Sequence, residues 1–131
     1  MISYREALRY LYSFANYEFT PLDQATAAQL DLRRMRALLA RLGDPHRGRH
    51  TVHLTGSKGK GSTAAMIAAI LRQAGYRTGL YTSPHLHHET ERVRVDGEPI
   101  PEQEFVRLLE EMRPAVEAVN AASEYGRLTT F

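Results

Sequence analysis

The chain has 131 residues, of which 43% are hydrophobic, and this length and composition support one compact domain with a core. It contains no cysteine, which excludes disulfide scaffolds, thiol catalysis and cysteine-based zinc sites. Its 17 Lys and Arg against 15 Asp and Glu give a net charge of +2, too small for a broad nucleic-acid-binding surface.

Two helices are expected in the N-terminal third of the chain. Residues 3–17 begin with Ser3 and have Glu6 three positions later, the spacing of a capping box, followed by an apolar stripe. Residues 26–42 place leucines and a methionine at helical spacing, and Gly43 ends the pattern.

A strand–helix–strand unit is expected next. Residues 49–55 form a β-rich run, and residues 61–74 have a helical pattern that ends before Gly75. Residues 77–82 predict a second strand. A connection of this length favours parallel pairing of the two strands with a right-handed crossover.

A hairpin and a long helix complete the predicted α/β fold. Asp96-Gly97 is a strong turn signal between short strands over residues 92–95 and 98–100. The spacing of apolar residues then predicts a helix over residues 102–122, with Pro114 expected to kink it.

The glycine-rich segment between the first strand and its helix has the features of a phosphate-binding loop. Its glycines let backbone N–H groups approach a ligand, and the helix start adds its own free N–H groups. Lys60 can neutralise charge on the β- and γ-phosphates of a nucleotide, and a hydroxyl of Ser62 or Thr63 can reach Mg²⁺. The only two lysines of the chain, Lys58 and Lys60, both lie in this loop. The expected nucleotide contacts are Gly56, Ser57, Lys58, Gly59, Lys60, Gly61, Ser62 and Thr63.

The loop differs from a regular Walker A sequence. Two residues rather than four separate Gly56 from Gly59, and Gly61 stands between Lys60 and Ser62. A plain glycine-rich turn is the alternative interpretation. The predicted strand–loop–helix context favours phosphate binding.

The segment after the second predicted strand is a second candidate site. It would lie at the carboxyl edge of a parallel sheet, where ligands bind in α/β proteins. Ser83 could offer an oxygen to Mg²⁺ there, and His85 is a candidate substrate contact. The spacing of His85, His87 and His88 is poor for one tetrahedral metal ion.

Two features expected of a complete nucleotide-binding domain are missing. No predicted strand after residue 122 ends in the carboxylate that usually completes a magnesium site beside a phosphate loop. A core of two parallel strands is also too small, because parallel sheets need several strands and cover on both faces. We therefore expect this chain to be part of a larger assembly.

The chain resembles the N-terminal portion of the dihydrofolate synthase/folylpolyglutamate synthase family, within the Mur ligase superfamily. The matching stretches, in family order, are residues 32–39, 55–63, 74–86, 91–100 and 128–131. The resemblance implies the N-terminal part of a P-loop NTPase-like Mur ligase ATPase domain. It further implies that residues 1–131 form a single partial domain and that the glutamate-binding C-terminal domain is absent.

The resemblance also implies an ATP-dependent, amide-forming ligase of folate biosynthesis and polyglutamylation. ATP would phosphorylate a carboxylate of dihydropteroate or a folate, and the amine of L-glutamate would attack the acyl phosphate. Lys60 would be the catalytic residue, with ATP and Mg²⁺ as cofactors and Ser62 and Ser83 as metal ligands. The implied substrate contacts are Thr129, Thr130, Phe131, Gln29, Leu30 and His85.

The sequence departs from the family pattern at several positions. Ser57-Lys58 replace a usual Thr-Asn, and Asp31 and Arg33 replace a typical Gly and Glu. The family's magnesium-binding glutamate directly follows the position of Phe131, so the isolated chain is expected to be inactive.

Three alternatives remain open besides a fragment of the ligase: one half of a split ligase, a non-catalytic nucleotide-binding module, and a small-molecule kinase. We expect no membrane partner, because no apolar run approaches ~20 residues. We expect no nucleic-acid partner, because the net charge is small and the sequence shows no basic groove with interleaved aromatic residues. The N-terminus lacks a signal-peptide pattern, and a cytoplasmic protein is expected. Self-association through an exposed sheet edge is also plausible on physical grounds.

Overall fold

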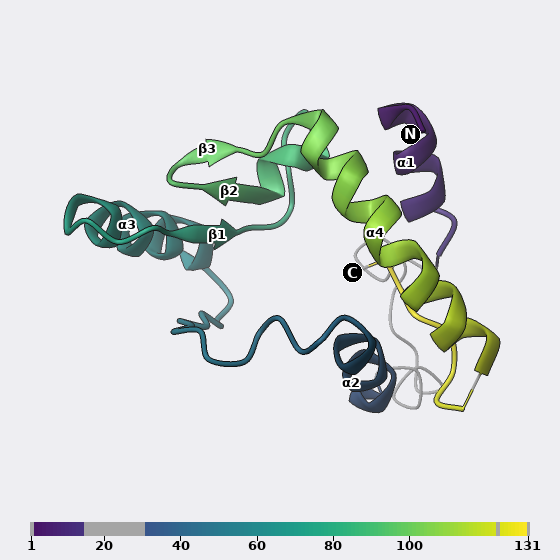
Figure 1. Ribbon diagram of the computed structural model, residues 1–131. Helices are drawn as coiled ribbons and strands as arrows, with labels where there is room; N and C mark the ends of the chain where they lie inside the picture. The colour runs from purple at the N-terminus through teal and green to yellow at the C-terminus, as the bar shows by residue number, and fades with distance from the viewer. Residues whose placement is uncertain (1, 15–30, 123, 131) are drawn as a thin grey trace. The chain divides into compact units, whose positions relative to one another are not determined.

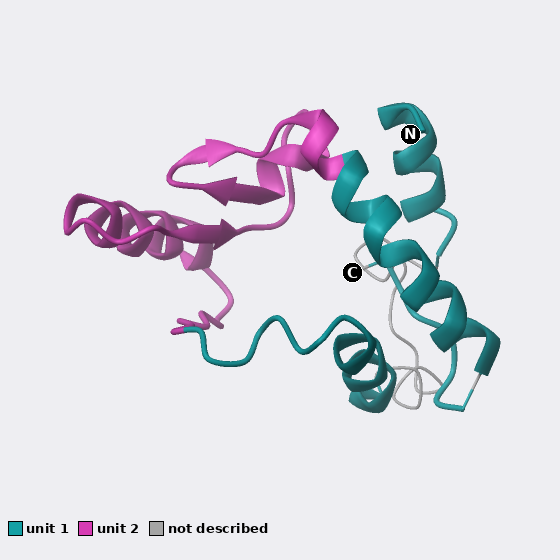
Figure 2. Ribbon diagram, viewed as in Figure 1, with its two compact units in different colours: residues 1–49, 106–131 teal, residues 50–105 magenta. Residues whose placement is uncertain are grey.

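The computed structural model describes residues 2–14, 31–122 and 124–130. These residues form helices and a small antiparallel sheet, so the α/β class is confirmed (Figure 1). The chain divides into two compact units, Met1–Arg49 with Val106–Phe131 as unit 1 and His50–Phe105 as unit 2 (Figure 2).

Of the two N-terminal helices of unit 1, the first begins after its predicted cap, and the described part of the second begins at Leu32, after an Asp31 cap that was not predicted. Helix α1 spans Tyr4–Leu11, and the Ser3–Glu6 capping box is confirmed: the Ser3 N–H donates to Glu6 Oε2 at 2.8 Å, while Ser3 Oγ accepts from the Glu6 N–H at 3.3 Å. Helix α2 spans Leu32–Arg41, and the Asp31 carboxylate accepts from its first turn at Arg33 N. Residues 15–30, which include parts of both predicted helices, lie outside the described residues.

Helix α4, Glu102–Ala122, runs through Pro114 and buries Val106 and Val119. A small core joins α4 to α2 and the C-terminal segment through Val119, Leu38 and Leu128. Helix α1 contacts α4 at its start, where the Ile2 N–H donates to Glu110 Oε1 at 2.8 Å.

Unit 2 is built from α3, Lys60–Gln73, and three strands in the order β1-β2-β3. The strands are β1 (Gly79–Tyr81), β2 (Val93–Val95) and β3 (Glu98–Pro99), and both pairings are antiparallel. The predicted turn is confirmed, because Asp96 and Gly97 both have positive φ, 52° and 93°. A short 3₁₀ helix, η2 (Glu89–Arg92), precedes β2 and was not predicted.

The predicted parallel strand pair is wrong. Residues 49–55 form no strand, and β1 pairs with β2 in antiparallel orientation. A lone parallel pair would leave both faces open to water, and Val52 is indeed 61% exposed. The pairing of β1 with β2, which is close in sequence, is stabilised instead. The Asp96 N–H donates to Thr78 O and Asp96 Oδ1 accepts from Thr78 N, both at 2.8 Å.

Helix α3 is amphipathic only weakly and has no buried residue. Met66 and Ile70 on this helix are 58% and 67% exposed. Among the described residues of unit 2, Ile100 is the one hydrophobic residue that is buried. The core of this unit is therefore smaller than the chain length led us to expect.

Candidate functional site

The glycine loop leads directly into α3. Gly59 is the N-cap residue of this helix and has a left-handed backbone with φ 74°, which glycine adopts without steric cost. The Thr63 N–H donates to Gly59 O at 3.0 Å, and the N–H groups of residues 60–62 come before this first hydrogen bond of the helix. Residues 56–62 are exposed, so an anion could approach the amides at the start of this helix.

Lys60 is the first residue of α3, and its ammonium group lies over the loop. Its Nζ donates to Gly56 O at 2.6 Å. The charge is thus held within the loop by a neutral carbonyl, and a phosphate oxygen at the same place would be a stronger, charged acceptor.

The segment bearing Ser83 lies on the same side of unit 2 as this loop. Helix α3 packs against β1 and the two run in opposite directions, so the start of α3 and the end of β1 face the same way (Figure 1). Ser62 lies in the first turn of α3 and Ser83 follows β1 by two residues. Both are exposed.

The His85 ring contacts two buried charged residues, Arg92 and Glu89. Its Nδ1 accepts from Arg92 Nε at 2.9 Å, and its Nε2 lies 3.2 Å from Glu89 Oε1. Because Arg92 can only donate, the ring proton must be on Nε2, pointing at Glu89. Arg92 and Glu89 are 2% and 8% exposed. The orientation of His85 is therefore fixed from the protein interior.

Glu91 is a residue that sequence reasoning missed. Its carboxylate accepts from three consecutive backbone N–H groups, those of Leu86, His87 and His88, at 2.9–3.0 Å. These bonds, that of Leu86 first, lower the pKa of Glu91 to about 2. The spacing of His88 and Glu91 matches a capping box and is the signal that could have revealed it.

The substrate-contact candidates of the C-terminal segment belong to unit 1. Thr130 Oγ1 donates to carbonyls near the end of α1, at 2.9 Å to Leu11 O and 3.2 Å to Phe14 O. The same segment is held by Arg34 Nη1, which donates to Arg127 O at 2.8 Å. Thr129 is half-buried. The candidates Gln29, Leu30 and Phe131 lie outside the described residues.

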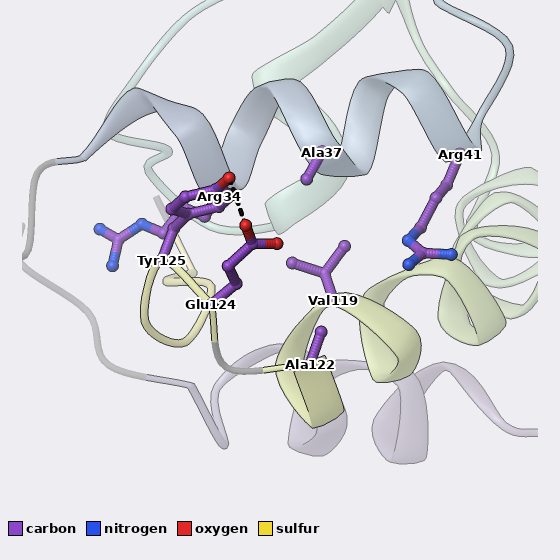
Figure 3. A pocket seen from close by; sticks show the side chains of 7 residues that line it. All are labelled: Arg34, Ala37, Arg41, Val119, Ala122, Glu124 and Tyr125. Atoms are coloured by element: carbon purple, nitrogen blue, oxygen red, sulfur yellow. Dashed lines mark hydrogen bonds between the residues drawn. The ribbon is translucent and has the colours of Figure 1, made fainter.

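A small pocket also lies in unit 1, between α2 and α4 (Figure 3). Its volume is about 40 Å³, enough for a few water molecules and far below the ~300 Å³ of an ordinary ligand pocket. The Tyr125 hydroxyl donates to Glu124 at its edge. The lining residues are Arg34, Ala37, Arg41, Val119, Ala122, Glu124 and Tyr125. A nucleotide or a folate does not fit in this pocket.

Within the described ranges, no group of three His, Asp or Glu side chains is arranged to hold a metal ion. The same residues include no helix with the length and apolar character needed to cross a membrane.

Comparison with known proteins relates the whole chain to folate-linked ligases. No protein-family model matches it. It is 39% identical over 130 residues to a probable bifunctional folylpolyglutamate synthase/dihydropteroate synthase of Haloferax volcanii, covering 99% of this chain and 14% of that protein. It is 44% identical over 100 residues to the dihydrofolate synthase/folylpolyglutamate synthase of Bacillus subtilis, covering 76% of this chain and 23% of that protein.

The fold agrees with the sequence comparison. The structure matches a solved FPGS–AMPPCP–folate complex with a TM-score of 0.83 and 35% identity, over 99% of this chain and 30% of the solved chain. The chain thus spans less than a third of the length of each of these proteins. By sequence and fold, it is related to the dihydrofolate synthase/folylpolyglutamate synthase family and corresponds to the N-terminal portion of its members.

Proposed function

We propose that this chain is the nucleotide-binding part of an ATP-dependent ligase that adds L-glutamate to dihydropteroate or a folate. The observation that carries the proposal is the match, over 99% of the chain, to a solved complex holding AMPPCP and folate. The ligase class is supported by the names of the relatives, which are folylpolyglutamate and dihydrofolate synthases.

The nucleotide would bind at residues 56–63, as in a P-loop NTPase. The exposed amides at the start of α3 support this assignment, together with the left-handed Gly59 and the ammonium group of Lys60. Lys60 would leave Gly56 O and contact the β- and γ-phosphates, where it neutralises the charge of the transferred group.

The hydroxyls of Ser62 and Ser83 fit a magnesium site, because they are hard oxygen donors at the two chain segments that face the same side of unit 2. Mg²⁺ would supply further neutralisation of the phosphate charge. The γ-phosphoryl group of ATP would pass to a substrate carboxylate, giving an acyl phosphate and ADP. The glutamate amine would then attack the acyl carbon, and inorganic phosphate would leave.

The folate or dihydropteroate would contact a separate set of residues. We assign to it Thr129, Thr130, Phe131, Gln29, Leu30 and His85. Within its own unit, each of the His85 ring and the Thr130 hydroxyl is oriented by hydrogen bonds, which favours a fixed side-chain position over a mobile one.

Calorimetric titration with AMPPCP and Mg²⁺ tests the proposal. Lys60→Ala should weaken binding by about 10- to 100-fold, the equivalent of one charged hydrogen bond. Arg77→Ala is the control, because it removes one exposed positive charge of the same unit outside the loop. The proposal fails if the wild-type chain does not bind AMPPCP, or if both variants bind as the wild type does.

We further propose that glutamate ligation needs polypeptide beyond these 131 residues and that the chain acts in the cytoplasm. The small fraction of each relative that the chain spans supports the first point. Adding the remaining polypeptide of a relative should restore glutamate-dependent ADP release. Nucleotide binding without any such release in the mixture would favour a non-catalytic nucleotide-binding module instead.

A further inference from the structure

The Glu91 carboxylate holds a stretch of exposed backbone, residues 86–88. Its Oε1 accepts from the His87 and His88 N–H groups at 3.0 and 2.9 Å, and its Oε2 accepts from Leu86 N at 3.0 Å. Leu86 is 85% exposed, so burial does not fix this segment. Three consecutive amides that converge on one carboxylate form a backbone nest, and each bond is strengthened by the negative charge.

The backbone of Glu91, in η2, also makes hydrogen bonds with residues on either side of it in the chain. The Glu91 N–H donates to His88 O at 3.0 Å, while Glu91 O accepts from Arg94 Nε at 3.3 Å. Glu91 therefore links the exposed segment 86–88 to β2, which is part of the sheet. The residue just before this segment, His85, is tied independently to the buried Arg92.

These contacts hold the backbone that follows Ser83, from His85 to His88, against η2 and β2. We propose that Glu91 is a positioning residue, whose carboxylate holds residues 86–88 so that the Ser83 hydroxyl is presented to a magnesium–nucleotide complex. The inference rests on the proposed function, because only that function includes a magnesium ion that Ser83 would coordinate. Glu91 itself would touch neither the metal nor the nucleotide.

Two measurements on the 131-residue chain test this inference. The first is hydrogen exchange of the Leu86, His87 and His88 amides by NMR without any ligand. The second is calorimetric titration with AMPPCP in the presence and absence of Mg²⁺, which yields the gain in affinity that the metal provides. The variants are Glu91→Ala and Glu91→Gln, with Glu98→Ala as the matched control, because Glu98 is an exposed glutamate of the same sheet.

Glu91→Ala should remove the protection of all three amides and reduce the magnesium-dependent gain by about tenfold or more, as loss of a supporting contact around a metal site does. Affinity without Mg²⁺ should stay within about twofold of wild type, because the glycine loop is untouched. Glu91→Gln keeps one carbonyl oxygen. If that oxygen replaces Oε1, the His87 and His88 amides stay protected, the Leu86 amide loses its acceptor, and the magnesium gain falls less than in Glu91→Ala.

The two proposals fail in different ways. Loss of amide protection in Glu91→Ala with an unchanged magnesium gain overturns the positioning role while leaving nucleotide binding intact. An equal loss in Glu98→Ala also overturns it. A wild-type chain that binds no AMPPCP overturns the proposed function, and the exchange data then show separately whether Glu91 holds the segment. Far-ultraviolet circular dichroism of each variant verifies that it is folded.

Discussion

Asp31 and Glu91 both accept hydrogen bonds from nearby backbone amides, and Asp31 is also paired with the Arg33 guanidinium. Asp31 caps α2 through Arg33 N, and the Arg33 side chain and backbone bonds together lower the pKa of Asp31 to about 2. Glu91 accepts hydrogen bonds from three backbone N–H groups, and its pKa is also lowered to about 2. In both cases the hydrogen-bonded form is the ionised one, so the local structure favours the charged carboxylate.

The Glu91 nest should therefore be sensitive to acid in a defined range. The folded-state pKa, about 2, lies below the ordinary value of 4.5, so the nest adds stability that is complete above about pH 4.5. This contribution is lost as the pH falls from 4.5 through about 2. The ¹³C shift of the Glu91 carboxyl group should titrate near pH 2, and the protection of residues 86–88 should decline with it. Glu91→Gln should abolish this pH dependence, and a midpoint near 4.5 in the folded chain would contradict the assignment.

The Ser3–Glu6 capping box was predicted from the sequence. Ser3 and Glu6 are three residues apart, so their reciprocal bonds follow from helix geometry alone. His85 was predicted as a substrate contact, but its bonds to Arg92 and Glu89 depend on how a loop folds back on η2. No periodicity in the sequence encodes that path. Glu91 was missed although its spacing from His88 matches a capping box.

At the scale of elements, the hairpin turn also supports the packing of α3. Arg72 Nη1, from the last turn of α3, donates to Asp96 O at 2.8 Å. The φ of 93° at this position favours glycine, and a Cβ on Gly97 would lie 1.8 Å from the same Nη1, so an alanine there would displace the end of the Arg72 side chain. The turn and the helix are therefore coupled.

Gly97→Ala should destabilise the chain by about 1–3 kcal/mol. About 1–2 kcal/mol arises from a left-handed backbone with a Cβ, and the displaced Arg72 bond adds to it. Gly79→Ala in β1 is the matched control, because its Cβ would meet nothing within 4 Å and its φ is not positive. Its unfolding free energy should stay within about 0.5 kcal/mol of wild type. Urea denaturation measures both, and equal stabilities for the two variants would contradict this coupling.

The elements that were predicted correctly depend on local signals. Helices α3 and α4 follow their apolar spacing and the turn follows Asp96-Gly97, each encoded within one segment. The strand expected over residues 49–55 needed a parallel partner across a whole helix. Its β-rich composition could not supply that partner, and the segment stays without strand pairing.

For the whole molecule, the family was identifiable from sequence because its motifs are short and occur in a fixed order. The fold and the relatives confirm that resemblance. The division of the candidate residues between two units was not predicted: the glycine loop belongs to unit 2 and the Thr129–Thr130 segment to unit 1. Composition and spacing describe each segment separately and give no distance between them.

Unit 2 exposes apolar surface beside an unpaired strand edge. Among the described strands, β1 is at the edge of the sheet, and Met66 and Ile70 on the adjacent α3 are more than half exposed. An edge strand with apolar neighbours favours pairing with another chain, and a second copy of this chain is always present at the same concentration.

We therefore expect the purified chain to self-associate in a concentration-dependent way. Ile70→Glu should shift sedimentation velocity profiles toward the monomer, because it removes apolar area from the exposed face of α3 and adds repulsion between copies. Gln73→Glu adds the same charge one turn further along the helix without removing apolar surface, and it separates the two effects. If charge alone drives dissociation, both variants become monomeric. If apolar contact drives association, only Ile70→Glu becomes monomeric. A wild-type chain that stays monomeric at every concentration would show that this face does not bind a second copy.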